Sequence, residues 1–203
     1  MNDNKPMKGC FDFVVSVFGL IILLPLFVIL GLLIFLHDKG PVFFKQVRVG
    51  KGGRLFKLYK FRSMSILKSG NEGSFEPGIT SRVTSIGRFI RKTKLDELPQ
   101  LINVVKGDMS LVGPRPEVKR WVSAFPENWK VILTVKPGIT DVASLEFRNE
   151  ESKLATDGDP ETTYKEIILP RKLELYEKYV SDHSFLGDLK ILFATLFLIF
   201  KRQ

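Results

Sequence analysis

Asp96 and Glu97 are adjacent carboxylates, and Pro99 and a run of apolar residues at helical spacing follow them. A proline suits the first turn of a helix, because the N–H that it lacks would be unpaired there. The rigid loop at residues 113–116, Gly-Pro-Arg-Pro, comes soon afterwards and presents Arg115. An acidic pair at a helix start beside such a loop predicts a site for a metal ion and phosphates. The plainer alternative is that both acids only complement the helix dipole.

The charge of the chain is concentrated around this pair. Residues 39–94 contain fourteen Lys or Arg and two acids, whereas the whole chain carries a formal charge of +9. A basic block of this kind binds phosphate as nucleic acid, anionic lipid or a phosphorylated substrate. Neither zinc-ligand spacing nor an aromatic RNA-binding consensus accompanies the block, so no nucleic-acid partner is expected.

Residues 13–36 form an uncharged apolar run of 24 residues, which as one helix would be roughly 36 Å long and could span a bilayer. Lysines flank the run on both sides, which by the positive-inside rule favours both ends on the cytoplasmic face. Pro25 lies near the midpoint and is expected to break the helix. We therefore predict a re-entrant helix-break-helix anchor over residues 1–38, with a spanning helix as the alternative.

Residues 191–200 form a second apolar run, closed by Lys201 and Arg202. The run is too short to span a bilayer, so we expect a helix in the membrane interface, with a buried core helix as the alternative. Cys10 is the single cysteine, so no internal disulfide forms, which allows a reducing, cytoplasmic environment.

The remaining patterns predict an α+β, mostly helical domain over residues 39–203, at the cytoplasmic face. Two short strands at 42–49 and 54–61 around a glycine-rich turn predict a β-hairpin. A polar loop is expected at 68–77. Helical patterns cover 86–93, 98–105, 117–124 and, with a break at Pro170, 161–180. The helices are expected to pack on the membrane surface.

Five blocks of the sequence together resemble the small monotopic phosphoglycosyl transferases, the bacterial sugar transferase family. They are KLYKFRSM at 57–64, LDELPQL at 95–101, NVVKGDMSLVGPRP at 103–116, VKPGIT at 135–140 and SFLGDLKI at 184–191. The likeness covers nearly the whole chain. It implies transfer of a phosphosugar from a UDP-sugar to a polyprenyl phosphate at the cytoplasmic face of the bacterial inner membrane, with Mg²⁺, to start glycan assembly.

The chemistry of this reaction assigns roles to the acidic pair. Joining two poorly reactive phosphates without ATP calls for a covalent intermediate, which a carboxylate can form as an acyl phosphate. Asp96 is the expected nucleophile, which displaces UMP from the sugar-bearing phosphate. Glu97 is the expected ligand of Mg²⁺, a hard ion that prefers oxygen donors.

Cationic side chains are expected to hold the phosphates. Arg115, Lys60 and Arg91 are the principal candidates, each with a solvated or lipid-facing basic residue as the alternative. Arg62 and Asp188 are additional candidates; Asp188 would either reach the metal site or pair near Lys190. The two histidines, His37 and His183, are expected to be structural or interfacial and not catalytic.

The sequence differs from the pattern of the family that it resembles at two places. Leu24 stands where related proteins often have Ser before the membrane proline, and residues 141–151 differ from the usual pattern in a segment where sugar selectivity is expected.

Two rival functions remain: a metal-dependent hydrolase of nucleotide or lipid diphosphates, and a non-enzymatic adaptor for anionic lipids. The sequence leaves open which UDP-sugar is used and whether the chain forms a homo-oligomer.

Overall fold

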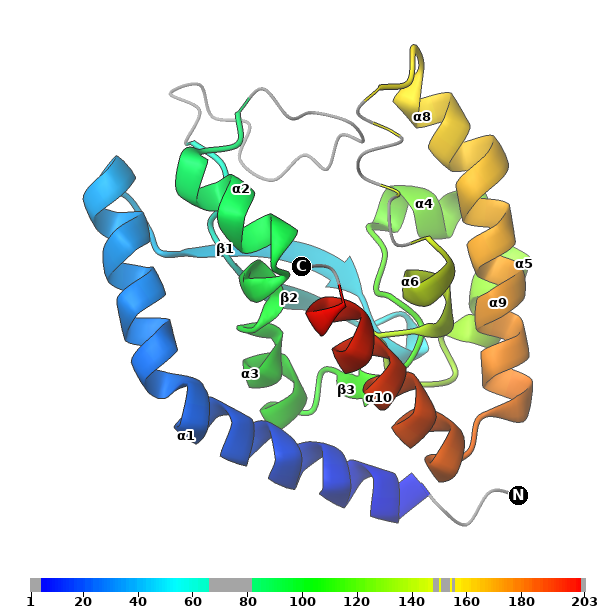
Figure 1. The fold of residues 1–203 in the computed structure, drawn as a ribbon. Coiled ribbons are helices and arrows are strands. Elements are labelled where there is room, and N and C mark those ends of the chain that lie inside the picture. Colours follow the sequence, from blue (N-terminus) through cyan, green and yellow to red (C-terminus); the bar gives the residue numbers. More distant parts are fainter. Residues whose placement is uncertain (1–4, 66–81, 148–149, 151–153, 155, 202–203) are drawn as a thin grey trace.

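The computed structural model describes residues 5–65, 82–147, 150, 154 and 156–201 (Figure 1). Its longest element is α1 (Lys5–Asp38), a helix of 34 residues that continues through Pro25. The expected break is therefore replaced by a bend, because a proline removes one backbone hydrogen bond while the rest of the ladder persists. Figure 1 shows α1 running beneath the molecule from its N-terminal end and then turning to rise along one side. Among the described helices, α1 alone is long and apolar enough to cross a membrane.

The helix α1 is held against the rest of the chain near both ends. Towards its N-terminus, the Lys8 ammonium lies 2.6 Å from the Asp188 carboxylate. Towards its C-terminus, Leu30 and Ile34 are buried in a cluster that includes Phe61. The outer face of α1 instead exposes many large apolar side chains. One stripe of the helix thus packs on the domain along its length, and the other stripe is left for a different environment.

The predicted hairpin is confirmed. The strands β1 (Phe43–Val49) and β2 (Leu55–Phe61) pair antiparallel, with Phe43 opposite Phe61 and Val49 opposite Leu55. The short turn η1 (Lys51–Gly53) joins them. One face of β2 packs towards the interior through Leu58, which is 4% exposed. The hairpin therefore forms a rigid arm beside the helices that follow.

Three short helical segments come next. They are α2 (Ser85–Lys92), the 3-10 turn η2 (Leu95–Glu97) and α3 (Gln100–Val105). The helices predicted at 86–93 and 98–105 are thus confirmed, with the second entered through a tighter turn. The loop predicted at 68–77 lies outside the described residues.

A second small sheet was not predicted. The strands β3 (Ser110–Val112) and β4 (Gly138–Thr140) pair in parallel. They approach so closely that a Cβ atom at Gly138 would lie 2.1 Å from the backbone nitrogen of Gly113, which no side chain could tolerate. Strands of three residues are too short to show a periodic pattern, so sequence alone does not reveal them.

The second half of the chain is helical. Its elements are α4 (Lys119–Ala124), α5 (Pro126–Ile132), α6 (Val142–Glu146), α8 (Pro160–Thr163), the π-helical turn η3 (Tyr164–Ile168), α9 (Leu169–Asp182) and α10 (Phe185–Phe200). The break expected at Pro170 does not occur. The wider π turn directly before it, closed by the N–H of Leu169 donating to Tyr164 O, lets the helix continue past a residue that lacks an N–H.

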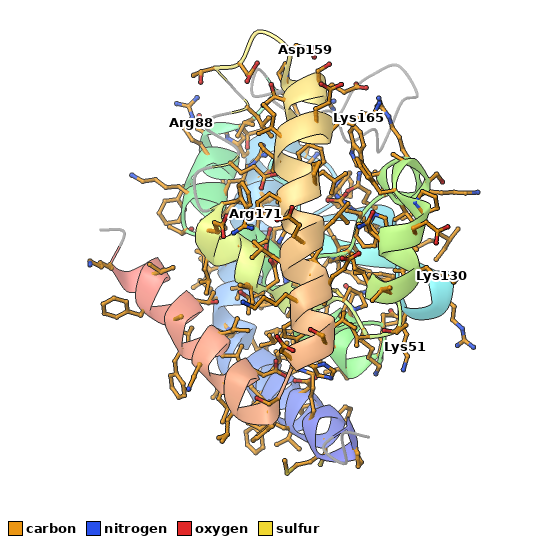
Figure 2. All side chains as sticks on the ribbon, turned by 90° about the vertical axis from the view of Figure 1, so that its right-hand side faces the viewer. Lys51, Arg88, Lys130, Asp159, Lys165 and Arg171 are labelled. Carbon is orange, nitrogen blue, oxygen red and sulfur yellow. The ribbon has the colours of Figure 1, made fainter. Side chains whose placement is uncertain are left out.

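The C-terminal helix α10 has two unlike faces. Ile191 and Leu192 pack against the cluster that contains Leu58, whereas Phe193 and Phe197 are 69% and 63% exposed. The helix begins earlier than the apolar run that predicted it, because Ser184 caps it by accepting a hydrogen bond from the N–H of Gly187. Neither a fully buried core helix nor a fully solvated one matches this pattern. Figure 2, which shows the molecule from the side, places Lys51 and Lys130 at its edge and Arg171 on the side of α9 that faces the viewer.

Candidate active site

The acidic pair lies in the turn between α2 and α3. Lys94 adopts a left-handed conformation, with φ of 60°, and reverses the chain so that η2 follows at once. This reversal carries both carboxylates towards the hairpin. Asp96 is 7% exposed, and the Glu97 side chain is 13% exposed. The pair is therefore buried and does not sit at a solvated helix start.

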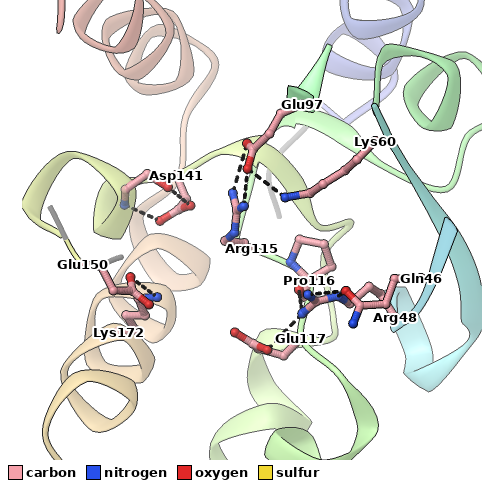
Figure 3. A network of polar contacts seen from close by, with 11 residues as sticks. Gln46, Arg48, Lys60, Glu97, Arg115, Pro116, Glu117, Asp141, Glu150 and Lys172 are labelled. Atoms are coloured by element: carbon pink, nitrogen blue, oxygen red, sulfur yellow. Dashed lines mark hydrogen bonds and ion pairs between the residues drawn. The ribbon is translucent and has the colours of Figure 1, made fainter. Parts of the chain in front are cut away.

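Two cations from distant parts of the chain meet at Glu97 (Figure 3). The Lys60 ammonium, on β2, donates to Glu97 Oε1 at 2.9 Å. The Arg115 guanidinium donates to Oε1 at 2.5 Å through Nη2 and to Oε2 at 3.3 Å through Nη1. A two-pronged contact of this kind fixes both groups in orientation. Two of the three principal cations predicted from the sequence, Lys60 and Arg115, thus contact the acidic pair.

Asp96 has a different environment from its neighbour. Its Oδ1 atom is buried and makes no hydrogen bond to the described residues. Burial raises the pKa of Asp96 from 3.8 to about 6; Lys60 acts against this rise, and the charge of Glu97 adds to it. Arg91, in the last turn of α2, is close enough to lower the same pKa slightly. Asp96 is therefore a buried, ionisable carboxylate with one oxygen that makes no hydrogen bond to the described residues.

Glu97 and Arg115 hold each other in their charged forms. Burial by itself would raise the pKa of Glu97, but Arg115 and Lys60 outweigh it and lower that pKa well below its usual range. Glu97 in turn raises the pKa of Arg115. Burial lowers the pKa of Lys60 despite the attraction of Glu97. Two adjacent carboxylates thus differ in pKa, which is typical of sites where neighbouring acids have separate roles.

The loop that carries Arg115 is fixed by a buried network that the sequence interpretation missed. Arg48 Nη1, on β1, donates to Pro116 O and to Glu117 Oε2, each at 3.1 Å. The Tyr164 hydroxyl donates to the other Glu117 oxygen at 2.5 Å. Glu117 is 5% exposed, so its charge depends on these partners. An acid directly after the Pro-Arg-Pro loop was the one local signal that could have indicated this support.

Asp141 lies on the other side of Arg115 (Figure 3). It caps α6 by accepting hydrogen bonds from the backbone N–H and the hydroxyl of Ser144. Burial raises the pKa of Asp141, and its charge contributes to the raised pKa of Arg115. Residues 141–151, which differ from the family pattern, therefore begin beside the candidate site.

The remaining predicted residues lie elsewhere. Arg62 contacts Asp38, at the end of α1, in an ion pair of 3.1 Å. Asp188 reaches neither a partner near Lys190 nor the acidic pair; it binds Lys8 and accepts a hydrogen bond from the Tyr179 hydroxyl at 2.7 Å. His183 stacks on Tyr179, as expected for a structural histidine.

The oxygen donors at the acidic pair suit a hard cation. Within the described residues, no group of three or more His, Cys, Asp or Glu side chains gathers as a ready metal site. Glu97 accepts three hydrogen bonds, and an ionised carboxylate offers about four lone-pair directions, so Oε2 keeps one free. Mg²⁺ commonly binds one or two carboxylates together with substrate phosphates and water. The ionised Glu97 beside Asp96 fits that donor set.

The chain is similar to known proteins over nearly its whole length. The family model described as bacterial sugar transferase matches residues 3–202. The chain is similar to the undecaprenyl-phosphate galactose phosphotransferase of Salmonella typhimurium, with 36% identity over 98% of this chain and 42% of that protein. It is also similar to the UDP-glucose:undecaprenyl-phosphate glucose-1-phosphate transferase of Klebsiella pneumoniae, with 34% identity over 96% of this chain and 40% of the relative.

A third relative has a length closer to that of the chain. It is the uncharacterized sugar transferase EpsL of Bacillus subtilis, with 39% identity over 94% of this chain and 85% of that protein. The chain thus spans about two fifths of the length of the Salmonella and Klebsiella relatives and most of the length of the Bacillus one.

Proposed function

Because the chain belongs to the bacterial sugar transferase family, we propose that it transfers a phosphosugar from a UDP-sugar to a polyprenyl phosphate, releases UMP and initiates assembly of a membrane glycoconjugate. The names of two relatives support this choice of substrates, since one includes UDP-glucose and both include undecaprenyl phosphate. The single observation that carries the proposal is the contrast between the two adjacent carboxylates. Glu97 is held ionised by two cations, whereas Asp96 keeps a buried oxygen without a hydrogen bond to the described residues.

The contrast suits two successive displacements at one phosphorus atom. An Asp96 oxygen attacks the sugar-bearing phosphorus of the UDP-sugar, and the bond from that phosphorus to the bridging oxygen breaks, so that UMP leaves with the electron pair. A phosphate oxygen of the polyprenyl phosphate then attacks the same phosphorus. The bond to Asp96 breaks, which restores the carboxylate and leaves a polyprenyl diphosphate sugar.

The cations would stabilise the negative charge that gathers on these phosphates. Each terminal nitrogen of Arg115 donates one N–H to Glu97, and the guanidinium has further N–H groups for phosphate oxygens. Lys60 and Arg91 add positive charge on the hairpin and α2 sides of Asp96. Because Lys60 and Arg115 are already oriented by Glu97, little ordering is needed when the substrate binds.

Glu97 would hold Mg²⁺ together with substrate phosphate oxygens. When bound, the ion would neutralise charge on the diphosphate and on the UMP leaving group. The ionised state of Glu97 favours this role, since a metal ligand must be deprotonated.

The packing of α1 supports a re-entrant anchor over a spanning one. Both halves of α1 rest on the same domain, through Lys8 and Asp188 at one end and Leu30 and Ile34 at the other. A helix that crossed a bilayer would carry one of its ends away from the domain by roughly 30 Å. We therefore place α1, together with the exposed face of α10, in one leaflet of the bacterial inner membrane, with the catalytic domain on the cytoplasmic face.

One assay tests the proposal. The detergent-solubilised protein is incubated with Mg²⁺, undecaprenyl phosphate and each of several UDP-sugars, and both UMP and the lipid product are measured. We expect UMP release to depend on the lipid acceptor and to match formation of a lipid diphosphate sugar. Release of free sugar phosphate without acceptor would instead identify a hydrolase, and no turnover with any UDP-sugar would contradict the proposal.

A further inference from the structure

Arg62 is a buried arginine that the proposed chemistry at Asp96 does not use. It directly follows β2, and its backbone N–H donates to Val42 O at 2.9 Å, which extends the hairpin pairing by one residue. The residue is 7% exposed. Its Nη1 atom lies 3.1 Å from Asp38 Oδ2, yet within the described ranges neither Nη1 nor Nη2 makes a hydrogen bond.

This arrangement is incomplete for a buried charge. A guanidinium carries five N–H donors, and leaving such donors unmatched in a buried position is costly, more so for a charged group than for a neutral one. Asp38 does not fully compensate, because its Oδ2 atom also lacks a hydrogen bond to the described residues. The Asp38 side chain is 34% exposed, so it can turn to water. The Arg62–Asp38 ion pair is therefore suited to separate when an anion binds to Arg62.

A pocket surrounds the guanidinium where the end of α1 meets the start of α2. Apart from the Arg62–Asp38 pair, its lining residues are Ile34, His37, Met64, Thr84 and Ile86. One wall is apolar and belongs to the helix assigned to the membrane. The helix α2 packs close to this pocket, since a Cβ atom at Gly87 would lie 1.9 Å from Ser63 O. The pocket thus joins an apolar wall to a cation with unused donors.

The pocket is aligned with the candidate active site. Arg62 follows Lys60 by two residues, and its N–H extends the hairpin pairing, so the alternation of a strand assigns both residues to one face, with Cα atoms about 6.6 Å apart. Lys60 contacts Glu97. A phosphate bound at Arg62 would therefore lie on the same face of the hairpin as the cation that contacts the acidic pair.

We propose that the Arg62 pocket is a phosphate subsite that receives the head group of the polyprenyl phosphate acceptor before it reaches Asp96. Arg62 contacts the phosphate with both terminal nitrogens, and Asp38 is displaced to water. This inference rests on the proposed function. It concerns the acceptor, whereas Lys60, Arg91 and Arg115 serve the donor diphosphate.

Two substitutions with opposite expected effects test the subsite. Arg62→Gln should raise the KM for undecaprenyl phosphate by about tenfold or more, because a charge-assisted contact is lost. Asp38→Asn should lower that KM, because the competing carboxylate is removed. A purely structural ion pair would instead make both substitutions harmful, and parallel losses would overturn the inference. Arg88→Gln is the matched control: Arg88 is exposed on α2 and points outward in Figure 2, and the substitution removes the same charge.

The donor half of the reaction separates this inference from the proposed function. Exchange of labelled UMP into the UDP-sugar, measured without acceptor, should be the same in the wild type and in Arg62→Gln. An equal loss of exchange and of acceptor turnover would place Arg62 at the donor and contradict the subsite. Absence of any turnover in the wild type would contradict the proposed function itself.

Direct binding identifies the source of the phosphate. Thermal stabilisation of the detergent-solubilised wild type and Arg62→Gln is measured with undecaprenyl phosphate, undecaprenol, phosphatidylglycerol and inorganic phosphate. We expect stabilisation by undecaprenyl phosphate that is lost in Arg62→Gln, and none with undecaprenol. Equal, Arg62-dependent stabilisation by phosphatidylglycerol would identify a general lipid site, and stabilisation by inorganic phosphate alone would identify a simple anion site; either result would overturn the assignment to the acceptor.

Discussion

Arg115 holds Glu97 with both terminal nitrogens, at 2.5 Å and 3.3 Å, although the two residues lie on different loops. The Lys60 ammonium also donates a hydrogen bond to the Glu97 carboxylate. Glu97 therefore stays ionised, while the adjacent Asp96 is buried without comparable support and its pKa rises to about 6. This division between the two acids is the physical basis of the predictions below.

Replacing the nucleophile should stop the reaction. Asp96→Asn keeps the shape of the side chain but removes the attacking oxygen, so we expect turnover to fall by at least about a thousandfold, or roughly 4 kcal/mol in the barrier. The measurement is UMP release with the preferred UDP-sugar, with membrane binding of the variant as the control for folding. Activity within about tenfold of the wild type would exclude Asp96 from this role.

The metal requirement should depend on Glu97. EDTA is expected to abolish turnover and added Mg²⁺ to restore it. Glu97→Gln should lower the rate and also shift the Mg²⁺ titration to higher concentration, because the carboxylate loses its charge. Transfer by the purified wild type that continues in EDTA would be inconsistent with a metal role for Glu97.

The donor half-reaction should respond to pH near 6. Attack requires the ionised form of Asp96, whose pKa is raised to about 6. The UMP exchange rate should therefore be level above that pH and fall by about tenfold per unit below it. A profile that stays level down to pH 4.5 would mean that the attacking group has an ordinary or lowered pKa.

Asp96 should reduce the stability of the folded protein at neutral pH. Its pKa is higher in the folded state than the usual 3.8, so ionisation opposes folding once the pH exceeds that value, and the cost is complete above about 6. Asp96→Asn should accordingly raise the free energy of unfolding at pH 8, by up to about 3 kcal/mol, with a smaller gain at pH 5. Melting curves in one detergent at both pH values give the comparison. A gain in the free energy of unfolding that is larger at pH 5 than at pH 8 would contradict this prediction.

The two ends of α1 should lie on the same side of the membrane. In a Cys10→Ser background, single cysteines at Met7 and Lys39 should both react with a membrane-impermeant reagent only after the cells are opened. The reason is that Lys8 and Ile34 bind the same domain from opposite ends of the helix. Labelling at position 7 in intact cells would mean that α1 spans the membrane.

Local chemistry in the sequence determined the parts of the site that lie close together along the chain. Adjacent Asp96 and Glu97, the proline after them and the rigid loop around Arg115 are visible as residue types and spacings. The hairpin was predictable because strand alternation and a glycine-rich turn are local signals. The apolar stretch of α1 was predictable for the same reason, since its composition alone indicates a membrane environment.

Tertiary structure decided which of these pieces meet. Lys60 and Arg115 reach Glu97 across 37 and 18 residues of chain, and Asp188 pairs with Lys8 across 180. Such pairs depend on how whole elements pack, which no local periodicity encodes. The same holds for α1 at Pro25: a proline signals a lost hydrogen bond, but packing along both halves of the helix determines whether that loss becomes a break or a bend.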